Sequence, residues 1–288
     1  MLVLDGSSSM EQPFNAADGG MPATASRWSV LRNALVDPTQ GVVSALQSSV
    51  RFGLAVFGTA PTCPLPFGIV QPALDNADAI ASRLPEGMAP GMFTPTGAAL
   101  DVVIEGLADP TLTASGPQVI ILVTDGEPNS CGGSDFLGVP ATDFAPSIAA
   151  ALKAQAKHVE MHVIGFDVQS VQEHLKELAN LGAGLELRAS PGAPLHQPTS
   201  IESLTSTLRT LIEGELACDF ALAGASLVAG SECAGSVTLN GSALPCDVQD
   251  GWSLLDPTHI RLHGAACDAV KAQTAVLSAN FPCDALAM

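Results

Sequence analysis

The sequence predicts an α/β fold: a doubly wound, mostly parallel sheet with helices on both faces, followed by a small disulfide-containing antiparallel β domain. Apolar runs typical of buried strands alternate with helical patterns from the first residue to about residue 213, which favours a parallel sheet between two helix layers. From Ala217 onward no convincing helical period is found, and hairpin signals occur there together with five of the seven cysteines. We therefore expect two domains, residues 1–215 and residues 216–288.

The first part begins directly with a strand. Met1–Leu4 is apolar without alternation, as in strands that are buried on both faces of a sheet. A connection rich in Pro, Gly and Asn follows, after which Ser26 can cap a helix with Trp28, Leu31 and Leu35 on its buried face. By similar patterns, we expect further strands at 51–57, 68–71, 161–166 and 185–188, and helices at 27–35, 42–49, 75–84, 98–107, 144–157, 171–181 and 201–212.

The strongest strand signal is Gln118–Thr124, which is apolar and β-branched and lies between Gly-Pro and Asp-Gly. In a doubly wound sheet this fourth strand and the first strand lie side by side where the strand order reverses. The crevice at their carboxyl ends is the expected ligand site.

The second part carries turn signals in place of helical ones. Asn240-Gly241 between two short alternating segments predicts a hairpin with a type I′ turn, because both residues tolerate positive φ. A second turn is expected within 254–260 and a last strand within 274–281. These features predict a small antiparallel domain.

Oxygen-bearing side chains gather at the predicted crevice. Asp5, Ser7 and Ser9 follow the first strand at alternate positions, and Asp125 ends the fourth strand. Thr94 lies where a Gly-rich loop enters a helix, which adds a hydroxyl from a third direction. Two carboxylates at adjacent strand ends repel unless a cation lies between them. Hard oxygen donors favour Mg²⁺, Mn²⁺ or Ca²⁺ over zinc.

These three segments resemble the von Willebrand factor A (vWA) family, whose metal-ion-dependent adhesion site (MIDAS) combines D-x-S-x-S, a threonine before a T-G-x-x-L-type helix start, and T-D-G. The corresponding residues here are Asp5/Ser7/Ser9, Thr94 in TPTGAAL and Asp125 in VTDGEPN. Order, spacing and element type match over about residues 1–213. The resemblance implies a vWA, Rossmann-like fold for this part of the chain.

The resemblance also implies a role for each residue. Ser7, Ser9 and Thr94 would give hydroxyl oxygens to a divalent cation, with Mg²⁺ the first choice and Mn²⁺ or Ca²⁺ the alternatives. Asp5 and Asp125 would act through bound water and by orienting the hydroxyls. An Asp or Glu carboxylate of a protein partner would then fill the open position on the ion.

Three neighbouring residues leave alternatives open. Thr96 could replace Thr94 if the loop register differs. Ser8 should point away from the ion by alternation. Glu127 could contribute a water-mediated contact or could be an exposed turn residue.

Composition limits the partners and the compartment. The formal net charge of −18 opposes binding to nucleic acid or to an anionic membrane, and the longest apolar run, Val119–Val123, is too short to be a transmembrane segment. Seven cysteines without C-x-x-C suggest an oxidising compartment. We expect an extracellular, cell-surface or periplasmic location, with an export signal that is not visible and is missing upstream.

The cysteines suggest two bridges. Cys63 and Cys131 both lie at the ligand edge and could be joined, and a bridge between Cys233 and Cys246 across the Asn-Gly turn would be diagonal and could require a bulge. The set Cys218, Cys267 and Cys283 leaves one thiol over, or one that pairs with a cysteine outside the given sequence. His259, Arg261 and His263 share a face if HIRLH is a strand, which favours a half-exposed strand face over a zinc site.

Two kinds of enzyme fit the first motif less well than a binding protein does. A serine hydrolase would have a second glycine after Ser7-Ser8-Ser9, and a phosphatase using Asp5 would have a carboxylate where Ser7 stands. We therefore expect a binding protein and not an enzyme. A structural or assembly module with an incidental metal site stays open as the alternative.

Overall fold

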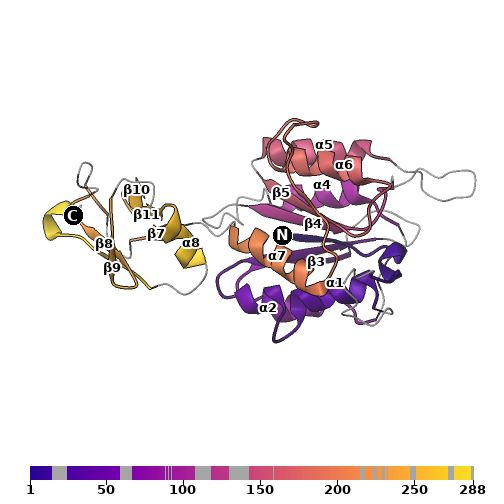
Figure 1. Ribbon diagram of the computed structural model, residues 1–288, viewed down its shortest axis with the longest axis horizontal. Helices are drawn as coiled ribbons and strands as arrows, with labels where there is room; N and C mark the ends of the chain where they lie inside the picture. The colour runs from indigo at the N-terminus through magenta and orange to yellow at the C-terminus, as the bar shows by residue number, and fades with distance from the viewer. Residues whose placement is uncertain are drawn as a thin grey trace, which may run out of the picture. The chain divides into compact units, whose positions relative to one another are not determined.

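The computed structural model describes residues 1–14, 25–58, 67–87, 89, 91, 93–107, 118–129, 143–157, 159–214, 218–222, 226–228, 231, 233–246, 251–271 and 276–286. The chain divides into two compact units, Met1–Leu211 and Ile212–Met288 (Figure 1). That each unit is an independent domain, with a boundary at residue 215, stays a prediction.

The first unit contains one sheet with the strand order β3-β2-β1-β4-β5-β6. Its strands are β1 (Leu2–Asp5), β2 (Phe52–Phe57), β3 (Phe67–Ala73), β4 (Val119–Thr124), β5 (Glu160–Gly165) and β6 (Leu195–His196). β3 is antiparallel to β2, and the other neighbouring pairs are parallel. β1 lies beside β4 with Leu4 opposite Val123, so the predicted adjacency of these two strands is confirmed.

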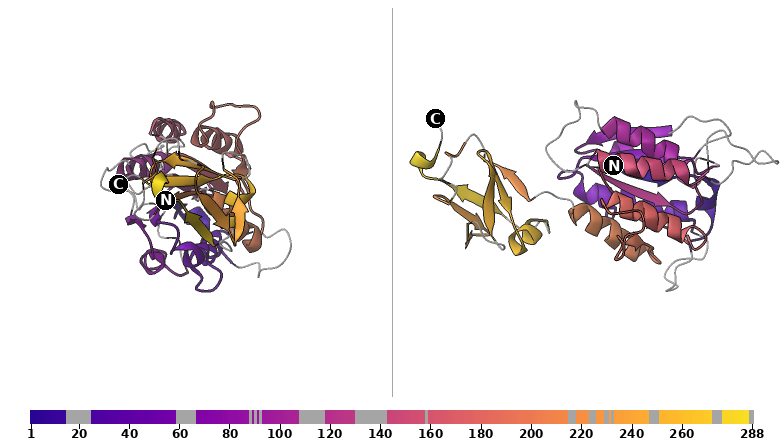
Figure 2. Two further views of the ribbon diagram at one scale, coloured as in Figure 1. Left: turned by 90° about the vertical axis from the view of Figure 1, so that its left-hand side faces the viewer. Right: turned by 90° about the horizontal axis from the view of Figure 1, so that it is seen from above.

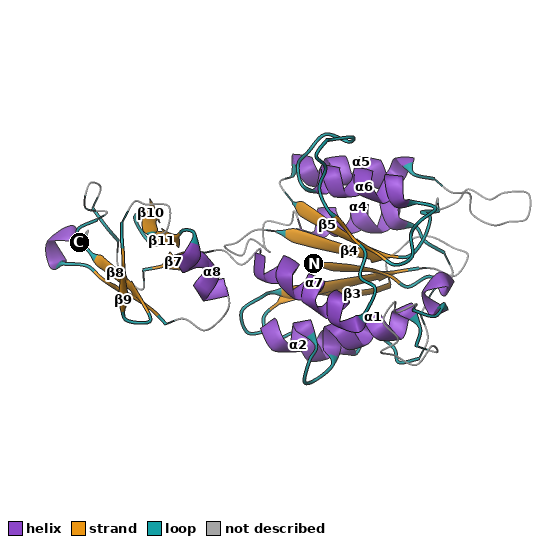
Figure 3. Cartoon of the chain, in the orientation of Figure 1, coloured by secondary structure: helices purple, strands orange, loops and turns teal. Residues whose placement is uncertain are grey.

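Helices cover both faces of this sheet, as predicted. They are α1 (Arg27–Val36), α2 (Val42–Leu46), α3 (Ala77–Ala81), α4 (Thr96–Leu107), α5 (Ala145–Ala156), α6 (Gln172–Gly182) and α7 (Ile201–Gly214). α4, α5 and α6 lie on one side of the strands, and α1, α2 and α7 lie on the other (Figures 1 and 3). A short 3-10 helix, η1 (Ser8–Glu11), follows β1.

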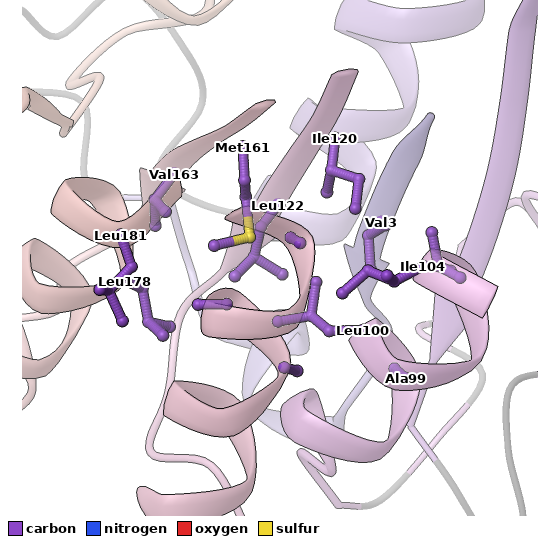
Figure 4. Close-up of a cluster of buried hydrophobic side chains, with 14 of the residues drawn as sticks. Val3, Ala99, Leu100, Ile104, Ile120, Leu122, Met161, Val163, Leu178 and Leu181 are labelled. Atoms are coloured by element: carbon purple, nitrogen blue, oxygen red, sulfur yellow. The ribbon is translucent and has the colours of Figure 1, made fainter. Parts of the chain in front are cut away.

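The core between the sheet and the layer of α4, α5 and α6 consists of aliphatic side chains. Figure 4 shows Val3, Leu122 and Val163 of the central strands facing Leu100 of α4 and Leu178 of α6. On the strand β1, Leu2, Val3 and Leu4 are all almost fully buried, so side chains on both faces of the sheet are covered. This burial explains why the strand shows no polar alternation.

The predicted strand at 185–188 is wrong. α6 ends at Gly182, and Gly184 adopts a positive φ of 76°, which turns the chain away from the helix. The buried side chain of Asn180 then donates to the Leu187 carbonyl over 3.0 Å and accepts from the Ala193 amide over 2.7 Å. These bonds hold the segment as a loop, and the sheet gains its last strand only at β6.

The second unit is mainly antiparallel strands in two small sheets, β10-β11-β7 and β12-β8-β9; Figure 2 (right) shows these strands in orange and yellow. They are β7 (Asp219–Ala221), β8 (Ser236–Leu239), β9 (Ser242–Leu244), β10 (Trp252–Asp256), β11 (His259–Leu262) and β12 (Leu277–Asn280). Asn240 and Gly241 join β8 to β9 with φ values of 50° and 80°. The hairpin, the turn between β10 and β11 and the last strand are therefore confirmed.

One helix of the second unit contradicts the sequence prediction. α8 (Ala265–Lys271) lies where no helical pattern was expected. Ala266 is buried, and Val270 four residues later packs against the same core. Both side chains lie on one helix face, but a helix of seven residues is too short for a clear period.

Two disulfides join parts of the second unit. Cys233–Cys246 is bonded with a Cα–Cα distance of 5.6 Å, which confirms the predicted bridge across the hairpin. Cys218–Cys267 is bonded with a Cα–Cα distance of 5.4 Å and ties α8 to the segment before β7. The predicted Cys63–Cys131 bridge and the side chain of Cys283 lie outside the described residues. In the described part of the chain no helix is long and apolar enough to cross a membrane.

Candidate functional site

The predicted site residues come together at the carboxyl ends of β1 and β4. Asp5 is the last residue of β1, and Asp125 directly follows β4. Because the two strands are adjacent and parallel, their ends meet at one edge of the sheet. The Thr124 hydroxyl donates to Asp5 Oδ2 over 2.6 Å, which joins the two strand ends.

A chain of hydrogen bonds links the two serines to both carboxylates. The Ser7 amide donates to Asp5 Oδ1 over 2.9 Å, so the carboxylate shapes the turn that follows the strand. The hydroxyls of Ser7 and Ser9 lie 2.9 Å apart, and the Ser9 hydroxyl donates to Asp125 Oδ1 over 2.7 Å. The Ser7 hydroxyl is therefore linked through Ser9 to Asp125 of the T-D-G motif.

Thr94 faces the same place from a third segment. Its Oγ1 and the Oγ of Ser9 each lie 3.8 Å from the point that a Cβ at Gly126 would occupy. Asn129 holds the Thr94 backbone through two hydrogen bonds. Its side-chain Oδ1 accepts from the Thr94 backbone amide over 3.0 Å, and its backbone amide donates to the Thr94 carbonyl over 2.8 Å. The buried Thr96 hydroxyl lies 3.4 Å from that same carbonyl, so it is directed into its own turn.

Three glycines let the loop before Thr94 approach the loop after β1. The Gly91 amide donates to the Gly6 carbonyl over 2.6 Å. A Cβ on Gly91 would overlap the backbone of Gly58, and a Cβ on Gly58 would lie 2.7 Å from the carbonyl carbon of Gly6. Gly58 also has a φ of 139°, which side chains disfavour. Backbone meets backbone at this crossing, which we call the glycine crossing (Gly6, Gly58 and Gly91).

The two carboxylates are buried close to each other. Asp5 is fully buried, and the side chain of Asp125 has no exposed surface. Burial, and in second place the charge of Asp125, raise the pKa of Asp5 to about 7. Burial and mutual repulsion make a second negative charge on this pair unfavourable, and a cation beside the two carboxylates would offset that cost.

Sequence reasoning missed three residues that contact the site. Arg27 Nη1 donates to Asp125 Oδ2 over 2.6 Å, and its Nη2 donates to Asp167 Oδ2 over 3.1 Å. Asn129 holds Thr94 as described above. A signal for Arg27 was available, because a cation in the first turn of a helix opposes the helix dipole and so suggests another purpose. Asp167 and Asn129 carried no such signal.

Two of the open alternatives concern residues beside the site. Ser8 is exposed, and its direction away from the ion stays a prediction. Glu127 is also exposed, and its water-mediated contact stays a prediction. Among the described residues, no group of three or more His, Cys, Asp or Glu side chains that could hold a metal ion is found.

Comparison with known protein families identifies the family of this chain. The family model of the von Willebrand factor type A domain matches residues 1–187. The chain belongs to this family. A search of curated proteins finds no relative by sequence.

Solved structures show the same vWA fold at low sequence identity. The pilus adhesin SpaC from Lactobacillus rhamnosus GG is 15% identical, with a TM-score of 0.51, and the match covers 91% of this chain and 37% of SpaC. The minor pilin PilB from Streptococcus sanguinis is 16% identical, with a TM-score of 0.50, and the match covers 74% of this chain and 60% of PilB. This vWA chain thus spans less than two thirds of either protein, and the likeness shows the fold alone.

Proposed function

We propose that the protein is a metal-dependent adhesion or protein-binding module. In this proposal Ser7, Ser9 and Thr94 supply hydroxyl oxygens to a divalent cation, Mg²⁺ first and Mn²⁺ or Ca²⁺ as alternatives. Asp5 and Asp125 orient those hydroxyls and hold bound water. The observation that carries the proposal is the hydrogen-bonded group of Asp5, Ser7, Ser9 and Asp125, with the Thr94 hydroxyl close to Gly126, the residue after Asp125.

The donor set fits a hard divalent cation. The proposed side-chain ligands are all oxygens, and the Ser9 hydroxyl is already hydrogen-bonded to Asp125 and to Ser7. The two carboxylates offset the charge of a divalent ion, and the hydroxyls add none. When bound, the ion would supply a positive centre with an open position for an anionic oxygen.

The residues around this position favour capture of a carboxylate from a protein. Asp125 Oδ1 is engaged by Ser9, and Asp5 is engaged by Ser7 and Thr124, so the chain's own carboxylates are held in place. An Asp or Glu side chain from a partner can therefore complete the site. The formal net charge of −18 would repel an acidic partner at long range, so electrostatic attraction would act only close to the ion.

The relatives and the disulfides support a role outside the cytoplasm. SpaC is described as a pilus adhesin and PilB as a minor pilin. Two disulfides in the second unit suit an oxidising compartment. We place the protein at the cell surface or in another extracytoplasmic location, where it binds a protein and acts without catalysing a reaction.

The test compares substitutions inside and beside the site. Thr94→Ala and Ser9→Ala should abolish Mg²⁺ and Mn²⁺ binding in calorimetry, because each removes one donor oxygen. Ser8→Ala is the matched control and should bind like the wild type, since Ser8 is exposed between the two serines of the site. Circular dichroism would verify that each variant is folded.

Partner binding is tested with the same variants. The wild type and Ser8→Ala should retain proteins from the native source in Mg²⁺ and release them in excess chelator, whereas Asp5→Ala and Thr94→Ala should retain none. Equal retention with chelator would favour the alternative, an assembly module whose metal site is incidental. Turnover of ester or phosphate substrates would point to an enzyme.

A further inference from the structure

Arg27 is fixed next to the proposed metal site by the start of α1. Ser26 caps the helix by accepting a hydrogen bond from the Ser29 amide over 3.2 Å. The Arg27 amide donates to the Gln12 carbonyl over 3.0 Å, directly after η1. The helix start is therefore tied to the segment that carries Ser7 and Ser9.

The position of Arg27 is unfavourable for the helix itself. The first turn of a helix carries positive partial charge and favours acidic side chains. α1 has no acidic residue in its first turn, and Arg27 adds a further positive charge there. The presence of arginine at this position is therefore explained by the side chains that its guanidinium contacts.

The guanidinium bridges two carboxylates that follow neighbouring strands. Nη1 reaches Asp125 after β4, and Nη2 reaches Asp167 after β5. The Asp125 end is buried, with side-chain exposures of 10% for Arg27 and 0% for Asp125, whereas Asp167 is 53% exposed. The planar fork of arginine, with two separate Nη groups, suits contact with both partners at once.

The two oxygens of Asp125 have separate partners. Oδ1 accepts from the Ser9 hydroxyl, and Oδ2 accepts from Arg27. We propose that Arg27 is a positioning residue and a built-in counter-ion: it holds Asp125 in place without metal and, by engaging that carboxylate, lowers the affinity of the site for a divalent cation. This inference rests on the proposed function for its metal-binding part alone.

Removing Arg27 should therefore have two opposite effects. The metal-free protein loses stability, because Asp125 stays buried without its partner. The cation, in contrast, binds more tightly, because the site keeps two buried carboxylates and no longer contains a competing positive charge. A residue that merely supports the fold would weaken both properties together.

The experiment uses the full chain with Arg27→Gln, and Arg32→Gln as the matched control. Arg32 lies on the same helix and pairs with the exposed Glu86. In chelator, Arg27→Gln should lower the melting temperature by about 5 °C or more. In calorimetry with Mg²⁺ or Mn²⁺ as the only ligand, Arg27→Gln should lower the dissociation constant of the ion about tenfold or more. Arg32→Gln should change neither quantity.

Further variants keep the test decisive if Arg27→Gln does not fold. Arg27→Gln/Asp125→Asn removes both members of the buried pair and should recover most of the lost stability. Arg27→Lys keeps the charge and should bind the ion within about threefold of the wild type. Asp167→Asn should weaken ion binding, because it removes a negative charge and leaves the positive charge of Arg27 less offset.

The outcomes separate this inference from the proposed function. If the wild type binds Mg²⁺ but Arg27→Gln binds it equally or more weakly, the counter-ion inference is overturned and the proposed function stands. If the wild type binds neither ion, the proposed function fails. In that case the melting temperatures of Arg27→Gln and the double variant test whether Arg27 stabilises Asp125. Equal melting temperatures for the two variants would overturn this stabilising role.

Discussion

Ser8 and Ser9 are neighbours in the chain but have different environments. Ser9 donates to Asp125, whereas Ser8 is exposed. The alternation in D-x-S-x-S could be recognised in the sequence because Asp5, Ser7 and Ser9 lie within one short turn. Thr94 and Asp125 could be added because each stands at a recognisable element boundary.

Other residues of the site could not be found in this way. Arg27 and Asp167 lie 140 positions apart in the sequence and meet only through the folded sheet. Asn129 holds Thr94 through backbone contacts that leave no pattern in the sequence. Residues that position a site through tertiary contacts therefore need the structure, while residues in local motifs do not.

His174 is a buried titratable group away from the site. Its Nε2 lies 2.9 Å from the Ser147 hydroxyl, and the ring packs against Phe144 with centroids 4.4 Å apart. Among the described residues its Nδ1 has no hydrogen-bond partner. Burial lowers the pKa of His174 below its ordinary value of 6.5, although the charge of Glu177 opposes this.

This pKa predicts a loss of stability in mild acid. As the pH falls below 6.5, the unfolded chain binds a proton at His174 but the folded protein does not. The free energy of unfolding should therefore fall by up to about 1.4 kcal/mol per pH unit for this group, until its folded pKa is reached. Urea unfolding at pH 7.5 and at pH 5.5 would measure the loss.

Variants of α6 isolate the contribution of His174. His174→Phe should reduce the dependence on pH, and His196, whose pKa is also lowered by burial, should account for part of what remains. Lys176→Gln, an exposed change on the same helix, should keep the wild-type dependence. An unchanged dependence in His174→Phe would show that His174 does not contribute.

At the scale of elements, tertiary contacts overrode local patterns in two places. The alternating residues of 185–188 resemble a strand, but the Asn180 side chain is hydrogen-bonded to the backbone of Leu187 and of Ala193 and holds this segment as a loop. α8 forms where no period was visible, and Cys267 connects it to Cys218. The long elements with strong patterns, such as β4 and α4, were predicted because many residues in each of them fit the pattern of a strand or a helix.

The two disulfides should stabilise the second unit to different extents. Cys218–Cys267 closes a separation of 49 residues, and Cys233–Cys246 closes one of 13. The entropy of the unfolded chain predicts a loss of about 4 kcal/mol when the longer loop is opened and about 3 kcal/mol for the shorter one.

Paired alanine variants measure this order. Cys218→Ala/Cys267→Ala should lower the free energy of unfolding more than Cys233→Ala/Cys246→Ala does, as seen by urea titration of Trp252 fluorescence. A larger loss from the hairpin bridge would show that native contacts around Cys233 matter more than loop length.

At the scale of the whole molecule, each unit has its own core and its own tryptophan. The chain contains two tryptophans, and both are buried: Trp28 in the first unit and Trp252 in the second. Trp28 donates to the Pro85 carbonyl over 3.0 Å, and Trp252 packs edge-on against Phe281. Each unit can therefore be followed by its own fluorescence.

These reporters predict separate responses to metal. Mg²⁺ should raise the melting temperature seen in Trp252→Phe, which retains Trp28, and should leave the transition seen in Trp28→Phe unchanged. Equal shifts in both variants would show that the units unfold together.

The glycine crossing has a consequence for how such a protein can diversify. Where Gly6, Gly58 and Gly91 meet, main chain rests on main chain, so the approach of the Thr94 loop does not depend on any side chain there. Exposed positions beside the proposed cation site, such as Ser8 and Glu127, can then be exchanged while the arrangement of Asp5, Ser7, Ser9 and Asp125 is kept. New specificity can evolve at the periphery provided that Gly58 and Gly91 accept no side chain.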